Sequence, residues 1–529
     1  MSKKIFLYDT TLRDGAQMKG INFSLEDKLG IVDQLDKLGI DYIECGWPSS
    51  NPKDEHFFKL IKNVRKNHIK IVAFGSTRHA KNKVEEDINL IKLVESGADA
   101  VTIFGKTWDL HATKALQIPL EENLVLIEES VSYLKKNGIK EVFFDAEHFF
   151  DGYKDNPEYS LKAIKAAEKG GADVIVLADT NGGTMYYEVG SIIEKLAKEL
   201  KIPLGIHTHN DTGMALANTI EAVRKGAIQV QGTMNGYGER TGNANLCEII
   251  PNLQFKMGYE GLGNNIKRLT KTSRYISEIA NMSHSENMPY VGNGAFAHKS
   301  GVHVNAVMKD PRTYEHIDPE LIGNRRKVLI SDLAGRSNVL FKAEELGIKL
   351  DKDSEAVKKA IELVKDYENQ GYEFEGADGS FELLLKSAMG TRKYFFDLEN
   401  FRLIVERNKK DITKSCYRMT SEATIKMVVK DSEKIHIVSE GDGPVNALDA
   451  ALRKSLIPHY PLIENIRLID YKVRVLNSKS GTASKVRVLV ETMNIKTKEK
   501  WGTVGVSENI IEASFEALID SIEYYLHKK

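Results

Sequence analysis

Two histidines stand two residues apart in the segment 206–211, which reads IHTHND. Successive side chains of a β-strand point to opposite faces, so His207 and His209 would share a face and converge on one point. Two convergent imidazoles are typical of a metal site. The alternative is that each histidine caps a neighbouring loop with a hydrogen bond. The rest of the chain has to discriminate between these two interpretations.

Short apolar runs alternate with amphipathic segments along the first half of the chain, and the runs are rich in β-branched and aromatic residues. Eight strand and helix units within about 250 residues are typical of a (β/α)8 TIM barrel, an α/β fold with its active site at the C-terminal strand ends. We therefore expect such a barrel. The eight runs begin at residues 4, 42, 70, 100, 141, 173, 203 and 227.

Polar residues collect at the ends of these predicted strands. A charged side chain in an apolar strand is costly to bury unless it is paired or binds a metal. So many at one barrel mouth favour a functional site. They are Asp9, Thr10, Thr11, Arg13, Asp14, Glu44, Asp145, Glu147, Asp179, Thr180, His207, His209 and Asp211, with the loop 235–245 (NGYGERTGNAN) after the last strand.

The two histidines could form a mixed nitrogen and oxygen donor set with one carboxylate, such as Asp14, and one amide oxygen, such as Asn243. Such a set suits Mg, Mn, Co or Zn in an open site, and the donors alone do not identify the divalent ion. A Lewis acid in this position would chelate an α-keto acid and polarise its carbonyl group.

Composition excludes several partners. The chain of 529 residues has a formal net charge of -1 and a sequence pI near 6.9, so we expect neither nucleic acid nor a membrane as a partner. Three well-separated cysteines, Cys45, Cys247 and Cys416, favour neither a disulfide framework nor a cysteine zinc site. No apolar run is long enough to cross a bilayer, and the N-terminus lacks a signal-peptide core. We expect a cytoplasmic protein.

Four motifs give a more specific prediction: DTTLRDGAQ at 9–17, HTHND at 207–211, NGYGERTGNAN at 235–245 and AFAHKSGVH at 295–303. They resemble those of the acetyl-CoA-dependent Claisen-condensing synthases, a family that contains α-isopropylmalate, homocitrate and citramalate synthases. The resemblance covers nearly the whole chain. It implies an acyltransferase that uses acetyl-CoA as co-substrate, needs a divalent metal and forms a homodimer.

The resemblance assigns roles to residues of the barrel. Asp14, His207, His209 and Asn243 resemble the family's metal ligands. Arg13 resembles the arginine that holds the keto-acid and enolate oxygens, a task suited to its fixed donor fork.

Other roles follow from the same resemblance. Thr180 resembles the hydroxyl that binds the substrate carboxylate, and Glu147 the glutamate that helps deprotonate the acetyl methyl group. His303 resembles the histidine that reaches into the barrel of the other subunit. Many family members carry Asp two residues later, whereas this chain has Asn305, which leaves the role of His303 less defined because a neutral amide stabilises an imidazolium less than a carboxylate does.

Several polar residues keep two interpretations. Glu44 and Asp179 are expected to orient the neighbouring groups. His298 is a support residue or a coenzyme contact. Tyr314 is an expected substrate contact, whereas Arg325 and Arg326 fit a solvated face equally well.

We predict three domains: a barrel at 1–281, a linker or lid with helical subdomains at 282–405, and an α+β regulatory domain at 406–529. The last contains a weak repeat of two strands and a helix, in which Ala447 and Leu452 match Ala513 and Leu518. The turn GDGPVNAL resembles the family's regulatory domain, so the expected effector is an end-product amino acid, isoleucine if the product is citramalate. The alternative role of this domain is simple dimer stabilisation.

The segment 44–58 (ECGWPSSNPKDEHFF) most resembles the branch of the family that uses pyruvate. The runner-up keto acid, 2-oxoisovalerate, is larger by two methyl groups, and an apolar pocket distinguishes each by only about 1 to 3 kcal/mol. Phe104 and Asp145 are the candidate wall residues. Retro-Claisen lyases, biotin-dependent carboxyl transferases and a non-enzymatic amino-acid sensor rank below the synthase. The loop 235–245 has no reactive cysteine, none of the predicted strand ends supplies a metal-bridging lysine, and the chain retains the polar set at the barrel mouth.

Overall fold

The structure is a computed structural model and describes residues 4–64, 66–330, 335–411, 414–429, 434–476 and 484–529. The chain divides into two compact units. Unit 1 consists of Met1–Phe296 and Ile317–Arg325, and unit 2 of Ala297–His316 and Arg326–Lys529. The three predicted domain ranges remain a prediction, and the boundary predicted after residue 405 falls inside a strand of unit 2.

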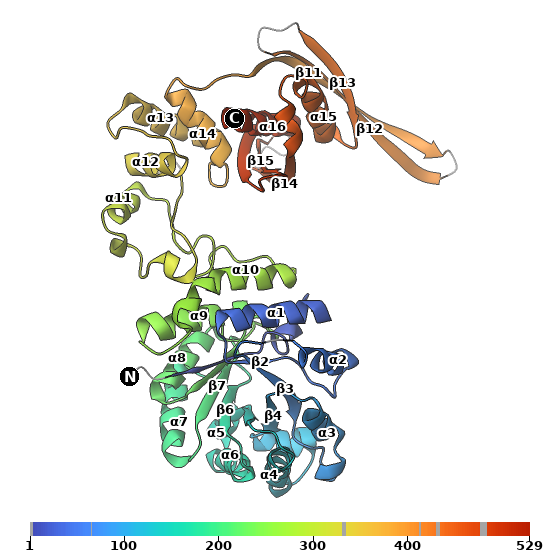
Figure 1. The fold of residues 1–529 in the computed structure, drawn as a ribbon, viewed down its shortest axis with the longest axis vertical. Helices are drawn as coiled ribbons and strands as arrows, with labels where there is room; N and C mark the ends of the chain where they lie inside the picture. Colours follow the sequence, from blue (N-terminus) through green and yellow to red (C-terminus); the bar gives the residue numbers. More distant parts are fainter. Residues whose placement is uncertain (1–3, 65, 331–334, 412–413, 430–433, 477–483) are drawn as a thin grey trace. The chain divides into compact units, whose positions relative to one another are not determined.

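Unit 1 is built on a closed barrel of eight parallel strands, which confirms the predicted (β/α)8 fold (Figure 1). β1 pairs with both β2 and β8 and so closes the sheet. Both faces of the sheet are covered, which is why the strands are apolar runs rather than alternating sequences. The strands are β1 (Phe6–Asp9), β2 (Tyr42–Glu44), β3 (Lys70–Ser76), β4 (Ala100–Lys106), β5 (Val142–Glu147), β6 (Val174–Asp179), β7 (Leu204–Thr208) and β8 (Gln229–Gly232).

Helices surround this barrel (Figure 1), and their ends follow local sequence signals. In the first helix, Ser24 accepts a hydrogen bond from Asp27 N in a capping box, and Gly39 ends the helix with a φ of 105°. The helices of unit 1 are α1 (Leu25–Leu38), α2 (Pro52–Ile61), α3 (Ile88–Glu95), α4 (Leu120–Lys136), α5 (Phe149–Asp155), α6 (Pro157–Gly170), α7 (Tyr186–Glu199), α8 (Ala215–Lys225), α9 (Leu246–Pro251) and α10 (Leu269–Ile279).

The first part of unit 2 is mainly helical. Its two short strands, β9 (Ala297–His298) and β10 (Lys327–Val328), form a parallel pair. The helices are α11 (Gly301–Lys309), α12 (Arg336–Glu345), α13 (Glu355–Gln370) and α14 (Asp378–Ala388).

The second part of unit 2 contains two three-stranded antiparallel sheets, each associated with a helix. The predicted order of two strands and a helix is present in both repeats, with an additional strand before each. The matched alanines and leucines of the repeat are all buried. The elements are β11 (Phe396–Asp411), β12 (Lys414–Val429), β13 (Ile435–Gly441), α15 (Pro444–Leu456), β14 (Ile466–Val475), β15 (Val486–Asn494), β16 (Lys500–Ser507) and α16 (Ile510–His527).

No helix among the described residues combines the length and the apolar character needed to cross a bilayer. Cys45 and Cys247 are free and buried, and burial raises the pKa of both thiols, that of Cys247 to about 12. The side chain of Cys416 lies outside the described residues.

Candidate metal and substrate site

The two histidines lie at the C-terminal end of β7, and the loop after β8 brings an amide to them. His207 is in the strand and His209 follows it. His209 pairs with Asn243 in an isolated antiparallel bridge. The loop requires glycine before Asn243, because a Cβ atom on Gly242 would lie 1.9 Å from Gly236 O and its φ is +91°.

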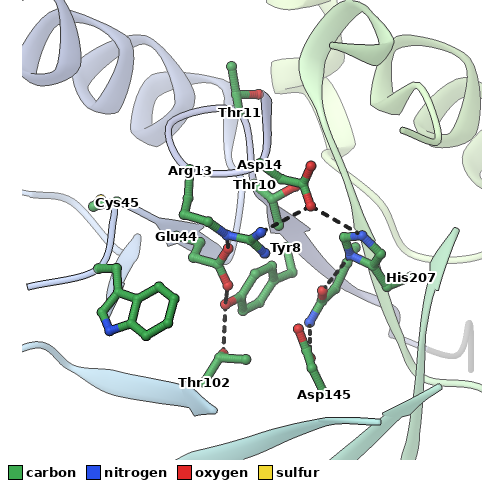
Figure 2. A network of polar contacts seen from close by, with 12 residues as sticks. Tyr8, Thr10, Thr11, Arg13, Asp14, Glu44, Cys45, Thr102, Asp145 and His207 are labelled. Carbon is green, nitrogen blue, oxygen red and sulfur yellow. Dashed lines mark hydrogen bonds and ion pairs between the residues drawn. The ribbon is translucent and has the colours of Figure 1, made fainter. Parts of the chain in front are cut away.

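Asp14 reaches the histidines from the turn after β1. Its Oδ2 atom lies 3.6 Å from His207 Nε2 and 4.0 Å from His209 Nε2, and Figure 2 shows Asp14 pointing toward His207. All three side chains are buried, and their ligand atoms lie within 4.8 Å of one another. The chain therefore places two imidazoles and one carboxylate where one metal ion could contact all three.

The fourth predicted ligand fits the same donor set. Asn243 Nδ2 donates to Asp14 Oδ1 at 3.0 Å and to Tyr237 O at 3.0 Å. Its Oδ1 atom is buried and has no hydrogen-bond partner among the described residues. An orphaned buried acceptor beside two imidazoles and a carboxylate suits a divalent cation that accepts nitrogen and oxygen ligands.

The protonation states at this site suit metal binding. Burial lowers the pKa of His209 to about 4, with the charge of His207 acting in the same direction. Burial raises the pKa of Asp14, but Arg13 and the two histidines outweigh it and bring the pKa to about 2. Near pH 7, a neutral imidazole and an ionised carboxylate therefore face each other, which are the forms that bind a metal.

Arg13 is fixed beside Asp14 by contacts on several sides (Figure 2). Its Nε donates to Glu44 Oε1 at 2.5 Å, and Nη1 donates to Asp14 Oδ2 at 3.1 Å. Its guanidinium lies over the ring of Phe74, 3.8 Å from the centroid. Tyr8 donates to the other oxygen of Glu44 at 2.6 Å. Glu44 thus orients Arg13, the kind of role expected for it from the sequence.

An aromatic wall borders Arg13. Phe74 stacks on Phe104 with 5.5 Å between ring centroids, and Trp47 meets both rings edge-on at 5.9 and 5.8 Å. Asp145 is buried on the inner face of the barrel. Burial, with the charge of Glu44, raises its pKa well above the ordinary range.

Glu147 and Thr180 lie at the ends of the neighbouring strands β5 and β6. Glu147 forms an ion pair with Lys106. Thr180 Oγ1 accepts a hydrogen bond from His148 N at 2.9 Å, which leaves its hydroxyl proton to donate elsewhere. Polar groups at one mouth therefore come from the ends of β1, β2, β4, β5, β6, β7 and β8 or from the loops that follow them.

His303 and Tyr314 lie in unit 2, so the structure does not place them with the barrel residues. Their rings lie against each other at a tilt of 32°, with 4.3 Å between centroids, and both side chains are exposed. Asn305 is 3.5 Å from Ser337 Oγ. The carboxylate next to Tyr314, Glu315, accepts from His298 and Arg326.

Those contacts of Glu315 are short. His298 Nε2 is 3.1 Å from Oε1, while Arg326 Nε and Nη2 donate to the two oxygens at 2.6 and 2.5 Å. His298 thus supports Glu315 in this structure, and its other expected role, as a coenzyme contact, stays a prediction.

Sequence reasoning missed four inward-facing residues at the barrel mouth. The sequence did carry a signal for Gln231. Gln229 and Gln231 stand two apart on a buried strand, the same spacing that singles out His207 and His209. Nothing in the local sequence distinguishes the other three from structural residues. They are Tyr8, Thr102 and Lys106. The expectation that no strand end supplies a lysine was wrong, because β4 extends one residue beyond the predicted run and ends at Lys106, which pairs with Glu147.

Comparisons with known proteins extend over the whole chain. Residues 4–276 match the HMGL-like family model, residues 290–372 the homocitrate synthase post-HMGL domain-like model, and residues 375–526 the LeuA allosteric (dimerisation) domain. An (R)-citramalate synthase from Geobacter sulfurreducens is 55% identical, covering 99% of this chain and 97% of that protein.

Two further relatives are similar over their full length. An (R)-citramalate synthase from Aquifex aeolicus is 53% identical, covering 100% of this chain and 99% of that protein. A 2-isopropylmalate synthase from Methanocaldococcus jannaschii is 31% identical, covering 99% of this chain and 95% of that protein.

Proposed function

Because the chain belongs to the family of the citramalate, 2-isopropylmalate and homocitrate synthases, we propose that it condenses acetyl-CoA with pyruvate and water to give (R)-citramalate and CoA. The observation that carries this proposal is the buried group of Asp14, His207 and His209 with Arg13 held against it. The (R)-citramalate synthases that are 45–55% identical support pyruvate as the keto acid.

The metal site consists of Asp14, His207, His209 and Asn243. A divalent ion bound there would act as a Lewis acid that polarises the keto carbonyl. The donor set accepts Mg, Mn, Co or Zn.

Arg13 and Thr180 fix the keto acid. Since Glu44 and Asp14 hold the guanidinium rigidly, its donors face the oxygen on which negative charge develops without reorganising. The Thr180 hydroxyl, oriented by His148 N, donates to the pyruvate carboxylate. Asp145 is the further proposed substrate contact, and its raised pKa reduces the repulsion between its carboxyl group and that carboxylate.

Glu147 and His303 form the base system, and Tyr314, whose ring lies against that of His303, is a substrate contact. The base takes a proton from the acetyl methyl group of acetyl-CoA, and the resulting carbon attacks the keto carbon of pyruvate. One carbon–carbon bond forms, and the former carbonyl oxygen takes up a proton. Water then cleaves the thioester and releases CoA, which makes the overall reaction irreversible.

The aromatic wall supports the smaller keto acid. Trp47, Phe74 and Phe104 pack rigidly on one another beside Arg13, so this side of the site has little capacity to yield to an isopropyl group in place of the pyruvate methyl group. The runner-up reaction, with 2-oxoisovalerate, would require this wall to move.

The second part of unit 2 carries the proposed regulation, inhibition by isoleucine. A cavity of about 720 Å³ lies between α15, β14 and α16. Asp449 Oδ1 is buried there and has no hydrogen-bond partner among the described residues, so it can accept from the ammonium group of an amino acid. Ile457, Leu468 and Leu518 supply apolar surface. The match to an allosteric (dimerisation) domain supports both this role and a homodimer.

The enzyme would then catalyse the first step of a threonine-independent route to isoleucine in the cytoplasm. The direct test is release of free thiol from acetyl-CoA by purified, metal-loaded protein, offered pyruvate and 2-oxoisovalerate in parallel. We expect release with pyruvate and much less with 2-oxoisovalerate. Release mainly with 2-oxoisovalerate would assign the enzyme to leucine biosynthesis.

His209→Ala provides the matching test of the site. We expect it to lose both bound metal and turnover while keeping its fold. A folded variant with unchanged turnover and metal content would refute the proposed site.

A further inference from the structure

A buried amide connects a proposed metal ligand to the proposed keto-acid pocket. Gln231 lies on β8 with no exposed surface and is the register partner of His207 on β7. Its Oε1 atom is 2.9 Å from His207 Nδ1, and its Nε2 donates to Asp145 Oδ1 at 3.1 Å. The resulting chain from His207 to Asp145 is visible in Figure 2.

The amide can act on His207 because a neutral imidazole exists in two tautomers. An oxygen facing Nδ1 selects the tautomer with the proton on Nδ1, which leaves the Nε2 lone pair free. Nε2 is the atom that lies 3.6 Å from Asp14 Oδ2. If the amide were reversed, its NH₂ group would face Nδ1 and the proton would sit on Nε2, which could then not bind a metal.

Asp145 determines which way the amide points. Its Oδ1 atom accepts from the amide nitrogen, so the oxygen must face His207. The three side chains are each at most 6% exposed, and water therefore cannot replace a missing partner without a cavity. The arrangement is a complete donor and acceptor chain rather than an isolated contact.

We propose that Gln231 is a positioning residue that sets the tautomer of His207 for metal binding and couples it to Asp145. The proposal rests on the metal site argued above and goes beyond it, since it adds a residue that does not contact the metal. Outer partners of metal-ligating histidines typically change metal affinity about 10-fold to 100-fold when removed.

The test measures metal affinity of the full-length apoprotein, by titrating Co²⁺ or Zn²⁺ against a chromophoric chelator and recording the d–d absorption of bound Co²⁺. We expect Gln231→Met to weaken binding about 10-fold to 100-fold and to alter the Co²⁺ spectrum. Gln229→Met is the matched control, because Gln229 lies on the same strand and face and is equally buried. It should bind Co²⁺ as the wild type does.

A pair of substitutions separates positioning from mere packing. Gln231→Glu places two carboxyl groups face to face and should weaken binding. Adding Asp145→Asn restores the pattern, because the new carboxylate accepts both from His207 Nδ1 and from the new amide at position 145. We expect the double variant to recover metal affinity to within about threefold of the wild type, as coupled neighbours do. Additive losses in the double variant would overturn the proposal.

His207→Ala separates a failure of the Gln231 proposal from a failure of the proposed metal site. If His207→Ala loses metal and Gln231→Met does not, the positioning role of Gln231 is wrong and the metal site stands. If His207→Ala binds metal normally, the proposed metal site itself fails. Thermal unfolding of each variant confirms that the measured protein is folded.

Discussion

Arg13 shows how far a single side chain can be defined by its neighbours. Glu44, Asp14 and the ring of Phe74 constrain its guanidinium. Burial lowers its pKa, but the charges of Glu44 and Asp14 outweigh burial, so the pKa is raised overall. It therefore stays charged at every accessible pH, with a fixed orientation. A lysine ammonium is a single point donor and cannot make the same contacts together.

We predict that Arg13→Lys lowers kcat/KM for pyruvate at least about 100-fold, the usual scale for removing one donor to a developing oxyanion. Steady-state thiol release measures the effect. Arg224→Lys is the control, because Arg224 forms an exposed bidentate pair with Glu221 on α8. A loss of similar size in both variants would contradict the role of Arg13.

Asp9 predicts a pH dependence of stability. Burial raises its pKa to about 7, with hydrogen bonds from Thr11 opposing the shift. A carboxyl whose folded pKa exceeds its unfolded value stabilises the protein below the unfolded value, about 4, and loses that contribution as the pH rises through 7.

We therefore expect the unfolding free energy of the wild type to fall by about 3 kcal/mol between pH 5 and pH 8 from this group alone. Asp9→Asn should lack that fall, since an amide can keep both contacts to Thr11 once the hydroxyl rotates. Urea unfolding of both proteins at several pH values measures it. Parallel curves for the two proteins would show that Asp9 does not titrate as described.

At the scale of single residues, sequence spacing predicted which side chains lie close together. It did not predict which hydrogen-bond partners they have. The two-residue spacing of His207 and His209 and the position of Asp14 after the first strand led to a group that the structure brings together. The bridge from Gln231 to Asp145 joins strands β8 and β5 across the barrel. No local pattern encodes such a contact, because it depends on barrel closure.

Among the elements, the segment from β9 to β10 carries His303 and Tyr314, two residues of the proposed active site. Glu315 anchors it with a side chain only 2% exposed, held by His298 of β9 and by Arg326 beside β10. Burial raises the pKa of Glu315, but Arg326 and His298 outweigh it and lower the pKa overall. The carboxylate of Glu315 is therefore charged, and its contacts hold the chain in place next to Tyr314.

We predict that Glu315→Gln lowers kcat about 10-fold and leaves metal affinity unchanged, because a misplaced catalytic group costs rate rather than metal binding. Thiol release and chelator competition measure the two quantities. Asp310→Asn, at an exposed pair with Arg312 in the same segment, should change neither. Equal effects of the two substitutions on kcat would refute the anchoring role.

The elements of the barrel could be predicted because parallel strands covered on both faces are apolar runs. The first strand of each C-terminal repeat, β11 and β14, could not. Their sequences, FDLENFRLIVERNKKD and IRLIDYKVRV, are rich in charge, and β14 is largely exposed. A strand with little burial gives no clear hydrophobic period, so the sequence-based boundary fell within β11.

For the whole molecule, the proposed metal and keto-acid site and the proposed effector cavity lie in different units. The polar groups of the barrel mouth belong to unit 1, and the cavity around Asp449 belongs to unit 2. A substitution in the cavity should therefore alter the response to an effector without altering the chemical step.

We predict that Asp449→Asn abolishes inhibition by isoleucine and leaves the uninhibited rate unchanged, because it removes the charge that would pair with the ammonium group. The rate of thiol release as a function of isoleucine concentration measures this. Asp442→Asn, at the exposed turn before α15, should retain inhibition. Normal inhibition of the Asp449 variant would place the effector elsewhere.

At this scale the order of motifs along the chain made the family predictable, because the motifs are spread from the first strand to the C-terminal repeat. The cavity in unit 2 was not predictable, because its lining comes from residues between 445 and 518 that only the packing of two sheets and two helices brings together.

The most direct test of the account is the fate of the acetyl methyl carbon. Metal-loaded protein would be given pyruvate and acetyl-CoA carrying ¹³C in the methyl group, and the products followed by NMR. We predict that the label appears in the methylene group of citramalate, and that chelation of the metal abolishes it. Label found only in acetate would show thioester hydrolysis without carbon–carbon bond formation and would contradict the proposed function.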